Sequence, residues 1–189
     1  MLKIAITGNI ASGKSAVERF LKEHGYTVYD TDIMAHNILE TNKDIKFVFK
    51  DDDIFTNDNI DRKKLAKIVF SNKEKLKKLE NIIHPVIINE LENIFKTSEQ
   101  NIIFIAVPQL FEAGLEGLFD KILFISADKN IRLKRLMKRN KISVDEANIR
   151  IAAQDDELKK IEKSDYVIKN NSSIVELEQN IKNFLANIY

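Results

Sequence analysis

The feature that most restricts the fold of this chain is an octapeptide near its start, Gly8-Asn9-Ile10-Ala11-Ser12-Gly13-Lys14-Ser15. It follows a short β-rich stretch, residues 2–7, and precedes apolar residues at helical spacing between positions 15 and 24. Gly13 lets the backbone approach a phosphate closely, and successive N–H groups at the start of a helix bind anions. The Lys14 ammonium is expected to reach the β- and γ-phosphates of a nucleotide, and the Ser15 hydroxyl to bind Mg²⁺. This P-loop (residues 8–15) predicts a nucleotide-binding α/β protein.

Short apolar stretches alternate with helical patterns along much of the remaining chain. Strands are predicted at residues 2–7, 26–29, 102–107, 121–126 and 165–169, and helices at 15–24, 131–139, 147–158 and 174–188. Strands that alternate with helices favour a parallel sheet covered by helices on both faces.

The middle third of the chain, residues 30–101, follows a different pattern. It is rich in Lys, Asn and Ile at helical spacing and contains little that resembles a strand. Pro85 disfavours helical geometry at His84, so we expect a helix boundary near His84, with Pro85 in the first turn of the next helix. The segment is interpreted as a helical insertion in an α/β core.

Composition excludes several classes of protein. The 189 residues include 30 basic and 29 acidic side chains, so a net charge of +1 gives no field that attracts nucleic acid or an anionic membrane. Without cysteine there is no disulfide, thiolate nucleophile or Cys-bound metal. The longest apolar run, residues 102–107, is far shorter than the roughly 20 residues that span a bilayer. The N-terminal residues lack the apolar region of a signal peptide, so the expected compartment is the cytoplasm.

Two carboxylates, Asp30 and Asp32, follow the second predicted strand. Ligands of doubly wound sheets bind outside the carboxyl ends of the strands, so either carboxylate is a candidate for holding Mg²⁺ or accepting a hydroxyl proton. The alternative is that one of them caps the helix that follows. Many nucleotide hydrolases place a metal-binding acid after the third strand, where this chain has Val107-Pro108. The expected metal ligands are therefore Ser15 and Asp32.

A basic segment, residues 129–141, contains seven lysines and arginines. Most of them are expected on the solvated face of a helix. Arg139 is the best candidate to fold over a nucleotide as part of a lid, because it ends the apolar periodicity and precedes a polar stretch. His84 is the histidine with the most site-like setting, although taken alone such a residue is more often structural.

Further motifs follow the P-loop in a specific order. They are Asp30-Thr31-Asp32, Ile60-Asp61-Arg62 with Leu65, Phe70-Ser71-Asn72, His84-Pro85, residues 107–112, residues 133–139, Ala153-Gln154 and Asn170-Asn171. With Thr7 and the P-loop, this series resembles the dephospho-coenzyme A kinase family over almost the whole chain. The departures from the family pattern are Ala16 for a frequent Thr, Thr31 for Ala, Gln109 for Leu and Ser172 for Gly, and none removes a group with an assigned chemical role.

The resemblance implies an α/β, P-loop kinase-like three-layer fold with a five-stranded parallel sheet, a helical acceptor-binding insertion and a small lid. Residues 1–31 and 97–189 would form the nucleotide-binding core, residues 32–96 the insertion that binds coenzyme A, and residues 138–154 the lid.

The implied activity is transfer of the ATP γ-phosphoryl group to the ribose 3′-hydroxyl of dephospho-coenzyme A, the last step of coenzyme A synthesis, with Mg²⁺ as the metal. Catalytic roles are implied for Lys14, Asp32 and Arg139. Contacts to ATP are implied for Asn9, Ile10, Ala11, Ser12, Gly13, Lys14, Ser15, Ala16 and Asn170. Contacts to the acceptor are implied for Thr7, Asp32, Arg62 and His84.

Two other classes of function are compatible with the P-loop. One is another small-molecule kinase, such as a nucleoside or nucleotide kinase. The Asp61-Arg62 and His84-Pro85 motifs distinguish this alternative from the family resemblance. The other is a GTP-dependent switch, whose guanine-binding motif Asn-Lys-x-Asp does not occur in this chain. The expected partners are ATP and dephospho-coenzyme A, with no nucleic acid or membrane, and the expected state is a monomer or weak homo-oligomer.

Overall fold

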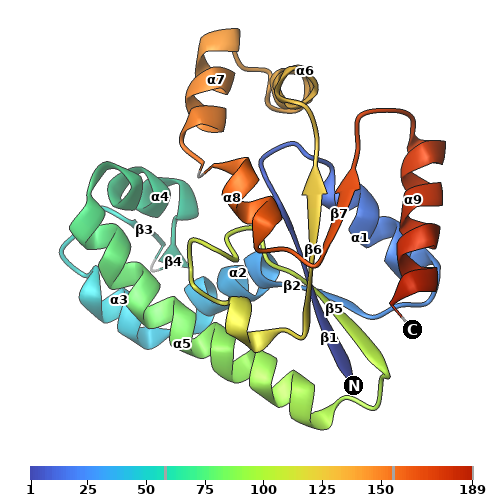
Figure 1. The fold of residues 1–189 in the computed structure, drawn as a ribbon. Helices are drawn as coiled ribbons and strands as arrows, with labels where there is room; N and C mark the ends of the chain where they lie inside the picture. Colours follow the sequence, from blue (N-terminus) through green and yellow to red (C-terminus); the bar gives the residue numbers. More distant parts are fainter. Residues whose placement is uncertain (58, 155, 189) are drawn as a thin grey trace. The chain divides into compact units, whose positions relative to one another are not determined.

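The computed structural model describes residues 1–57, 59–154 and 156–188, and the chain divides into two compact units (Figure 1). The first unit contains residues 1–30 and 99–189, and the second contains residues 31–98. Among the described residues, no helix is both long enough and apolar enough to cross a bilayer.

A five-stranded parallel sheet forms the centre of the first unit. Its strands are β1 (Leu2–Gly8), β2 (Val28–Asp30), β5 (Ile102–Ala106), β6 (Lys121–Ser126) and β7 (Tyr166–Lys169), in the order β2-β5-β1-β6-β7. Every neighbouring pair of strands is parallel. All five residues of β5 are buried, as expected for a strand covered on both faces. The predicted five-stranded parallel sheet is confirmed, and β1 is its central strand.

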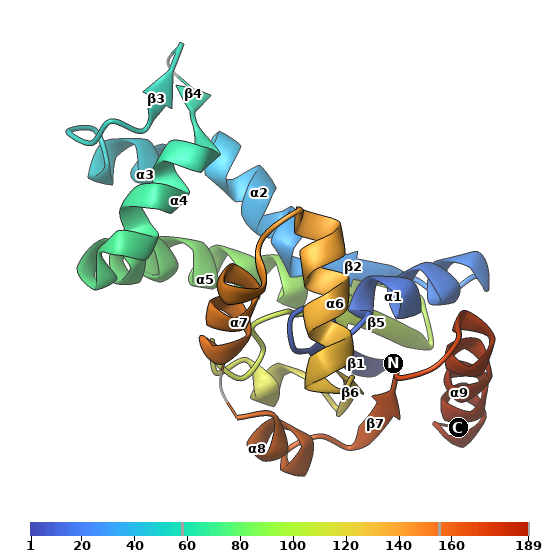
Figure 2. The same ribbon diagram turned by 90° about the horizontal axis from the view of Figure 1, so that it is seen from above.

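Helices α1 (Lys14–Glu23) and α9 (Ile174–Asn187) lie side by side against one face of this sheet (Figures 1 and 2). Both helices present apolar residues at intervals of three and four, so one stripe of each is buried. The core of this face is formed by Ile4, Ile6, Val17, Phe20, Leu21, Ile102, Phe104, Leu123, Ile125, Ile168, Leu177, Ile181 and Phe184. This apolar layer fixes α1, and therefore the loop that precedes it, relative to the central strand.

Three helices, α6 (Lys129–Asn140), α7 (Val144–Ala152) and α8 (Glu157–Glu162), connect β6 to β7. The prediction of one helix over residues 147–158 is wrong, because α7 ends at Ala152 and α8 begins only at Glu157. Both helices have their own N-caps: the Ser143 hydroxyl accepts from the Glu146 N–H, and the Asp156 carboxylate accepts from the Leu158 N–H. These local caps stabilise two helix starts where apolar spacing alone indicates a single helix. A single-turn 3₁₀ helix, Glu116–Leu118, precedes β6.

The second unit is mainly helical. It contains α2 (Thr31–Thr41), α3 (Lys43–Val48), α4 (Arg62–Ser71) and α5 (Lys73–Thr97), with a two-stranded antiparallel hairpin of β3 (Phe55–Thr56) and β4 (Asn59–Ile60). The sequence patterns miss this hairpin because each strand is two residues long, too short to show an alternating pattern.

The expected helix boundary near His84 is wrong, because α5 continues through Pro85 for a total of 25 residues. A proline inside a helix removes one backbone donor and disfavours the preceding turn. Here the helix places Leu79, Ile83, Ile87 and Leu91 in buried positions on both sides of the proline. This buried stripe favours one continuous helix over a break.

An ion pair at the edge of the main sheet provides a test of how β6 and β7 are joined. The Asp165 carboxylate accepts from Lys121 Nζ at 2.9 Å and from the Ile122 N–H at 2.8 Å. Partial burial acts to raise the pKa of Asp165, but the hydrogen bonds from Lys121 and Ile122 outweigh it and hold this pKa below its ordinary value. The hydrogen bond with Asp165 raises the pKa of Lys121.

Because the folded-state pKa of Asp165 is lowered, its contribution to stability is present above the unfolded pKa and is lost as pH falls through the folded value. We expect Asp165→Asn to lower the free energy of unfolding by about 0.5–1 kcal/mol at neutral pH. In acid, where both states of the wild type are protonated, the difference should approach zero. Urea unfolding at both pH values measures this, and an equal loss at both would contradict the role of the charge.

Candidate active site

The P-loop lies at the carboxyl end of the central strand. Strand β1 ends at Gly8 and helix α1 begins at Lys14, so the loop connects the middle of the sheet directly to a helix N-terminus. Three of its residues have positive φ: Gly8 at 157°, Ala11 at 61° and Gly13 at 103°. In open α/β sheets this edge is where ligands bind, and backbone N–H groups at a helix N-terminus attract anions.

Both P-loop glycines are in close contact with other parts of the first unit. A Cβ atom at Gly8 would collide with the backbone carbonyl oxygen of Ile125, and one at Gly13 would collide with the side-chain nitrogen of Asn170. Glycine is therefore required at these positions by packing within the protein itself. At Gly13 it is also required by the left-handed backbone.

Lys14 and Ser15 begin helix α1. Lys14 Nζ donates to Glu18 Oε1 at 2.8 Å, and the two side chains are 15% and 10% exposed. The carboxylate one helical turn later thus holds the ammonium near the start of the helix. Ser15 is exposed in the first turn of α1, so its hydroxyl is accessible to a ligand.

A group of hydrogen bonds holds the second half of the P-loop. The backbone carbonyl of Ser12 accepts from Asn170 Nδ2 at 2.8 Å and from Arg135 Nη1 at 3.3 Å. Arg135 Nη2 also donates to Asn170 Oδ1 at 3.3 Å, so the three residues are mutually linked. Asn170, expected as a contact to ATP, is buried and directly follows β7. Its amide nitrogen and oxygen both take part in this arrangement, which places it next to Gly13.

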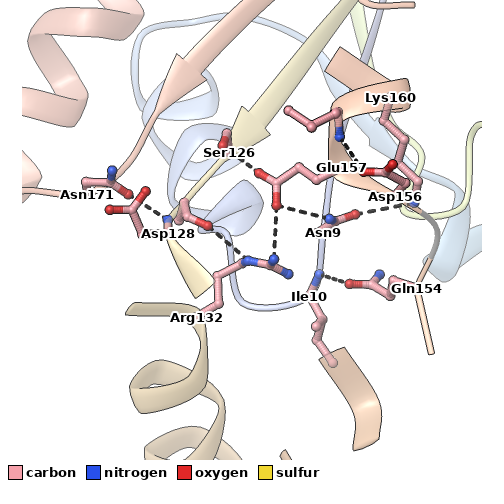
Figure 3. Close-up of polar contacts among 12 residues, drawn as sticks. Asn9, Ile10, Ser126, Asp128, Arg132, Gln154, Asp156, Glu157, Lys160 and Asn171 are labelled. Atoms are coloured by element: carbon pink, nitrogen blue, oxygen red, sulfur yellow. Dashed lines mark hydrogen bonds and ion pairs between the residues drawn. The ribbon is translucent and has the colours of Figure 1, made fainter. Parts of the chain in front are cut away.

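The first half of the P-loop is held by charged residues from α6, α8 and the loop after β5. Figure 3 shows the Glu157 carboxylate receiving hydrogen bonds from Asn9, Ser126 and Arg132. The ammonium of Lys160 donates to Asn9 Oδ1 and to Glu112. We call these six residues the Asn9 network. Ile10 is held separately, because its N–H donates to Gln154 Oε1 at 2.6 Å.

Of these residues, the sequence patterns assign a role only to Asn9 and Ile10. Glu157, Lys160 and Arg132 lie outside the family motifs, and Glu112 ends the motif of residues 107–112 without an implied function. Gln154 belongs to one of the family motifs but carries no implied function. The one signal in the sequence is that Arg132 lies four residues before Leu136, on the face of α6 that the structure buries.

The basic helix α6 is largely solvated, as expected, but Arg132 and the half-buried Arg135 are exceptions. Lys129, Lys134, Lys138 and Arg139 are exposed. Arg132 is only 6% exposed and is paired with Glu157, so it does not belong to the solvated face. Arg139, the expected lid residue, lies in the last turn of α6, where its Nε donates to Asn140 Oδ1 at 2.8 Å.

The remaining expected residues lie in the second unit, apart from Thr7, which is buried near the end of β1, and Ala16, which is half-buried in α1. Asp32 is exposed in the first turn of α2. Arg62 is the first residue of α4, and its guanidinium contacts His36 Nδ1. Backbone hydrogen bonds from Lys64 and Lys63 lower the pKa of Asp61, which caps this helix. His84 is half-buried within α5.

The side chains of the P-loop fit a magnesium–nucleotide complex. Within residues 1–57, 59–154 and 156–188 there is no cluster of three or more His, Asp or Glu that would hold a metal by itself. Mg²⁺ usually keeps several waters and binds one or two protein oxygens together with substrate phosphates. An exposed Ser15 hydroxyl beside Lys14 is the kind of single oxygen ligand that such a complex uses.

Comparison with known proteins agrees with this geometry. The family model described as dephospho-CoA kinase matches residues 2–176. A dephospho-CoA kinase from Fusobacterium nucleatum is 41% identical over 188 residues, which cover 98% of this chain and 97% of that protein.

Solved structures give the same result. A dephospho-CoA kinase from Campylobacter jejuni has a TM-score of 0.76 at 33% identity, covering 98% of this chain and 96% of that chain. A shikimate kinase from Bacteroides thetaiotaomicron, 13% identical, has a TM-score of 0.58 over 99% of this chain and 98% of that chain, and shares the fold alone. The fold is therefore that of a P-loop kinase, and the chain belongs to the dephospho-CoA kinase family.

Proposed function

We propose that this chain transfers the γ-phosphoryl group of ATP to the ribose 3′-hydroxyl of dephospho-coenzyme A, giving coenzyme A and ADP. The observation that carries the proposal is family membership over residues 2–176, in a chain whose P-loop lies at the carboxyl end of the central strand. Its proposed compartment is the cytoplasm.

The P-loop is the proposed site for the phosphates of ATP. The N–H groups at the start of α1 and the Lys14 ammonium would attract the β- and γ-phosphates electrostatically. Glu18 keeps the lysine in place. The Ser15 hydroxyl is the proposed protein ligand of Mg²⁺, with Asp32 as a second, and the bound ion would neutralise charge on the phosphates.

Residues 31–98 are the proposed site for the acceptor. In the sheet, Asp30 is in register with Ala106, and Ala106 with Ile6. The strand before this segment therefore ends at the same edge of the sheet as the strand before the P-loop. Asp32 follows two residues later in the chain. Thr7, Arg62 and His84 are the other proposed contacts to the acceptor.

The proposed reaction needs one proton acceptor. The 3′-oxygen forms a bond with the γ-phosphorus, while the bond from that phosphorus to the oxygen bridging it to the β-phosphate breaks. Asp32 accepts the hydroxyl proton, and ADP leaves with the electrons of the broken bond. Arg139, at the start of the proposed lid (residues 138–154), would stabilise the charge on the transferring group.

A substrate panel combined with two carboxylate variants tests the reaction. With ATP and Mg²⁺, the wild type should release ADP with dephospho-coenzyme A and not with nucleosides or nucleoside monophosphates. Asp32→Asn should lower kcat by about 10²–10⁴-fold while ATP still binds, because general bases contribute this much. Asp30→Asn serves as the comparison. If Asp30→Asn is inactive and Asp32→Asn is fully active, Asp30 is the proton acceptor.

Arg62 tests whether the second unit binds the acceptor. A guanidinium can bind a phosphate or pyrophosphate through two parallel hydrogen bonds. Arg62→Ala should therefore raise the KM for dephospho-coenzyme A by about tenfold or more, equivalent to ~1.4 kcal/mol, and leave the KM for ATP unchanged. Lys63→Ala, which removes an exposed cation next to it, should change neither constant. If Arg62→Ala shifts only the melting temperature, Arg62 has a structural role.

Gly13 tests the nucleotide site. Gly13→Ala places a methyl group against Asn170, so the loop must shift, and we expect ATP affinity to fall by about tenfold or more. The matched control is Gly25→Ala, since Gly25 also has a positive φ but a Cβ there meets nothing within 4 Å. That variant should lose about 1–2 kcal/mol of stability from backbone strain alone. Calorimetric titration with ATP distinguishes them, and equal affinities would contradict the tight packing around Gly13.

A further inference from the structure

Asn9, the second residue of the P-loop, bridges two partly buried ion pairs. Its side chain is enclosed by protein, and the residue is 5% exposed. Asn9 Nδ2 donates to Glu157 Oε2 at 3.3 Å, and Asn9 Oδ1 accepts from Lys160 Nζ at 3.3 Å. Both ends of the amide are therefore occupied by groups of helix α8, which is 148 and 151 residues away in the sequence.

Each charged neighbour of Asn9 has a further partner. Arg132 Nη2 lies 2.9 Å from the Glu157 carboxylate, which also accepts from Ser126 Oγ at 2.6 Å. Lys160 Nζ lies 2.5 Å from Glu112. The network thus contains two positive and two negative charges, and buried charges are tolerated when they are paired and hydrogen-bonded in this way.

The polarity of Asn9 matches its two neighbours. An amide offers a donor to the carboxylate of Glu157 and an acceptor to the ammonium of Lys160 at the same time. An aspartate would keep the contact with Lys160 but place a second carboxylate against Glu157. A leucine of similar size would supply neither bond.

The same residue shapes the P-loop through its backbone. The Asn9 carbonyl accepts from the Ser12 N–H at 3.1 Å, which closes the turn that leads to Gly13. The next residue, Ile10, is held by Gln154. A rotation of Asn9 would therefore redirect the loop whose N–H groups face the phosphates.

We propose that the Asn9 side chain is a positioning residue of the nucleotide site: it fastens the start of the P-loop to α8, and Glu157 in turn holds Asn9. This inference rests on the proposed nucleotide site. It gives the side chain an indirect role, in which it orients the loop from behind and does not touch ATP. Loss of Asn9 leaves Glu157 with Arg132 and Ser126, and Lys160 with Glu112, so the fold is expected to persist.

ATP affinity measured by calorimetry, without any acceptor, tests the proposal. Asn9→Leu should raise the Kd for ATP by about tenfold or more, equivalent to ~1.4 kcal/mol. Asn9→Asp, which keeps the size and polarity of the residue, should weaken binding in the same direction and serves if the leucine variant fails to fold. Glu157→Gln should also weaken binding. In the double variant Asn9→Leu/Glu157→Gln the two effects should not add, because both act through one contact.

The control is Asp165→Asn, which removes a hydrogen-bonded charge just before the amino end of the edge strand β7 and should leave the Kd for ATP within twofold of wild type. Wild-type affinity in Asn9→Leu and Asn9→Asp would overturn the proposal. So would wild-type affinity in Glu157→Gln, since Asn9 would then act on the nucleotide directly. A wild type that binds ATP but does not phosphorylate dephospho-coenzyme A would contradict the proposed function, while these affinities would still decide the role of Asn9.

Discussion

The hydrogen bonds that fix the P-loop at both of its ends are the constraint on which the rest of the site depends. Asn9 and Ile10 are bound by residues around the start of α8, and the Ser12 carbonyl is bound by Asn170 and Arg135. The central strand brings the loop to the carboxyl edge of the sheet, and the packed helix α1 fixes its exit. Because these contacts come from the protein itself, we expect the loop to be ordered before ATP binds, which would lower the cost of binding at the proposed phosphate site.

The charged side chains around the P-loop are paired with groups of opposite charge, which offsets the cost of removing them from water. Glu157 and Glu112 offset Arg132 and Lys160 behind the loop, while Lys14 in front of it is paired with Glu18. The buried pairs contribute little net stability on their own, because desolvation opposes their attraction. Instead, the two ion pairs fix the orientation of the side chain that bonds to both of them, which is the amide of Asn9 in the P-loop.

The fold could be predicted from the sequence wherever the signal is local. The Gly-Lys-Ser turn and the apolar strands are of this kind, and so is the stripe of α9. Predictions failed where contacts distant in the chain decide the result. Pro85 indicates a helix end, but buried residues on both sides of it keep α5 continuous. Arg132 appears as one cation of a solvated helix, whereas its partner Glu157 is 25 residues away. Asn9 was identified as part of a motif, but its contacts come from α8, which the sequence patterns merged with α7.

Hydrogen exchange of the P-loop amides in the nucleotide-free protein tests most directly the claim that the loop is formed before a ligand binds. The account predicts slow exchange at Ile10 and Ser12, whose N–H groups donate to Gln154 and to the Asn9 carbonyl. Addition of ATP and Mg²⁺ should then add protection at Gly13, Lys14 and Ser15 and change Ile10 and Ser12 little. Fast exchange at Ile10 and Ser12 that becomes slow only when ATP is added would contradict it, because the nucleotide would then be building the loop.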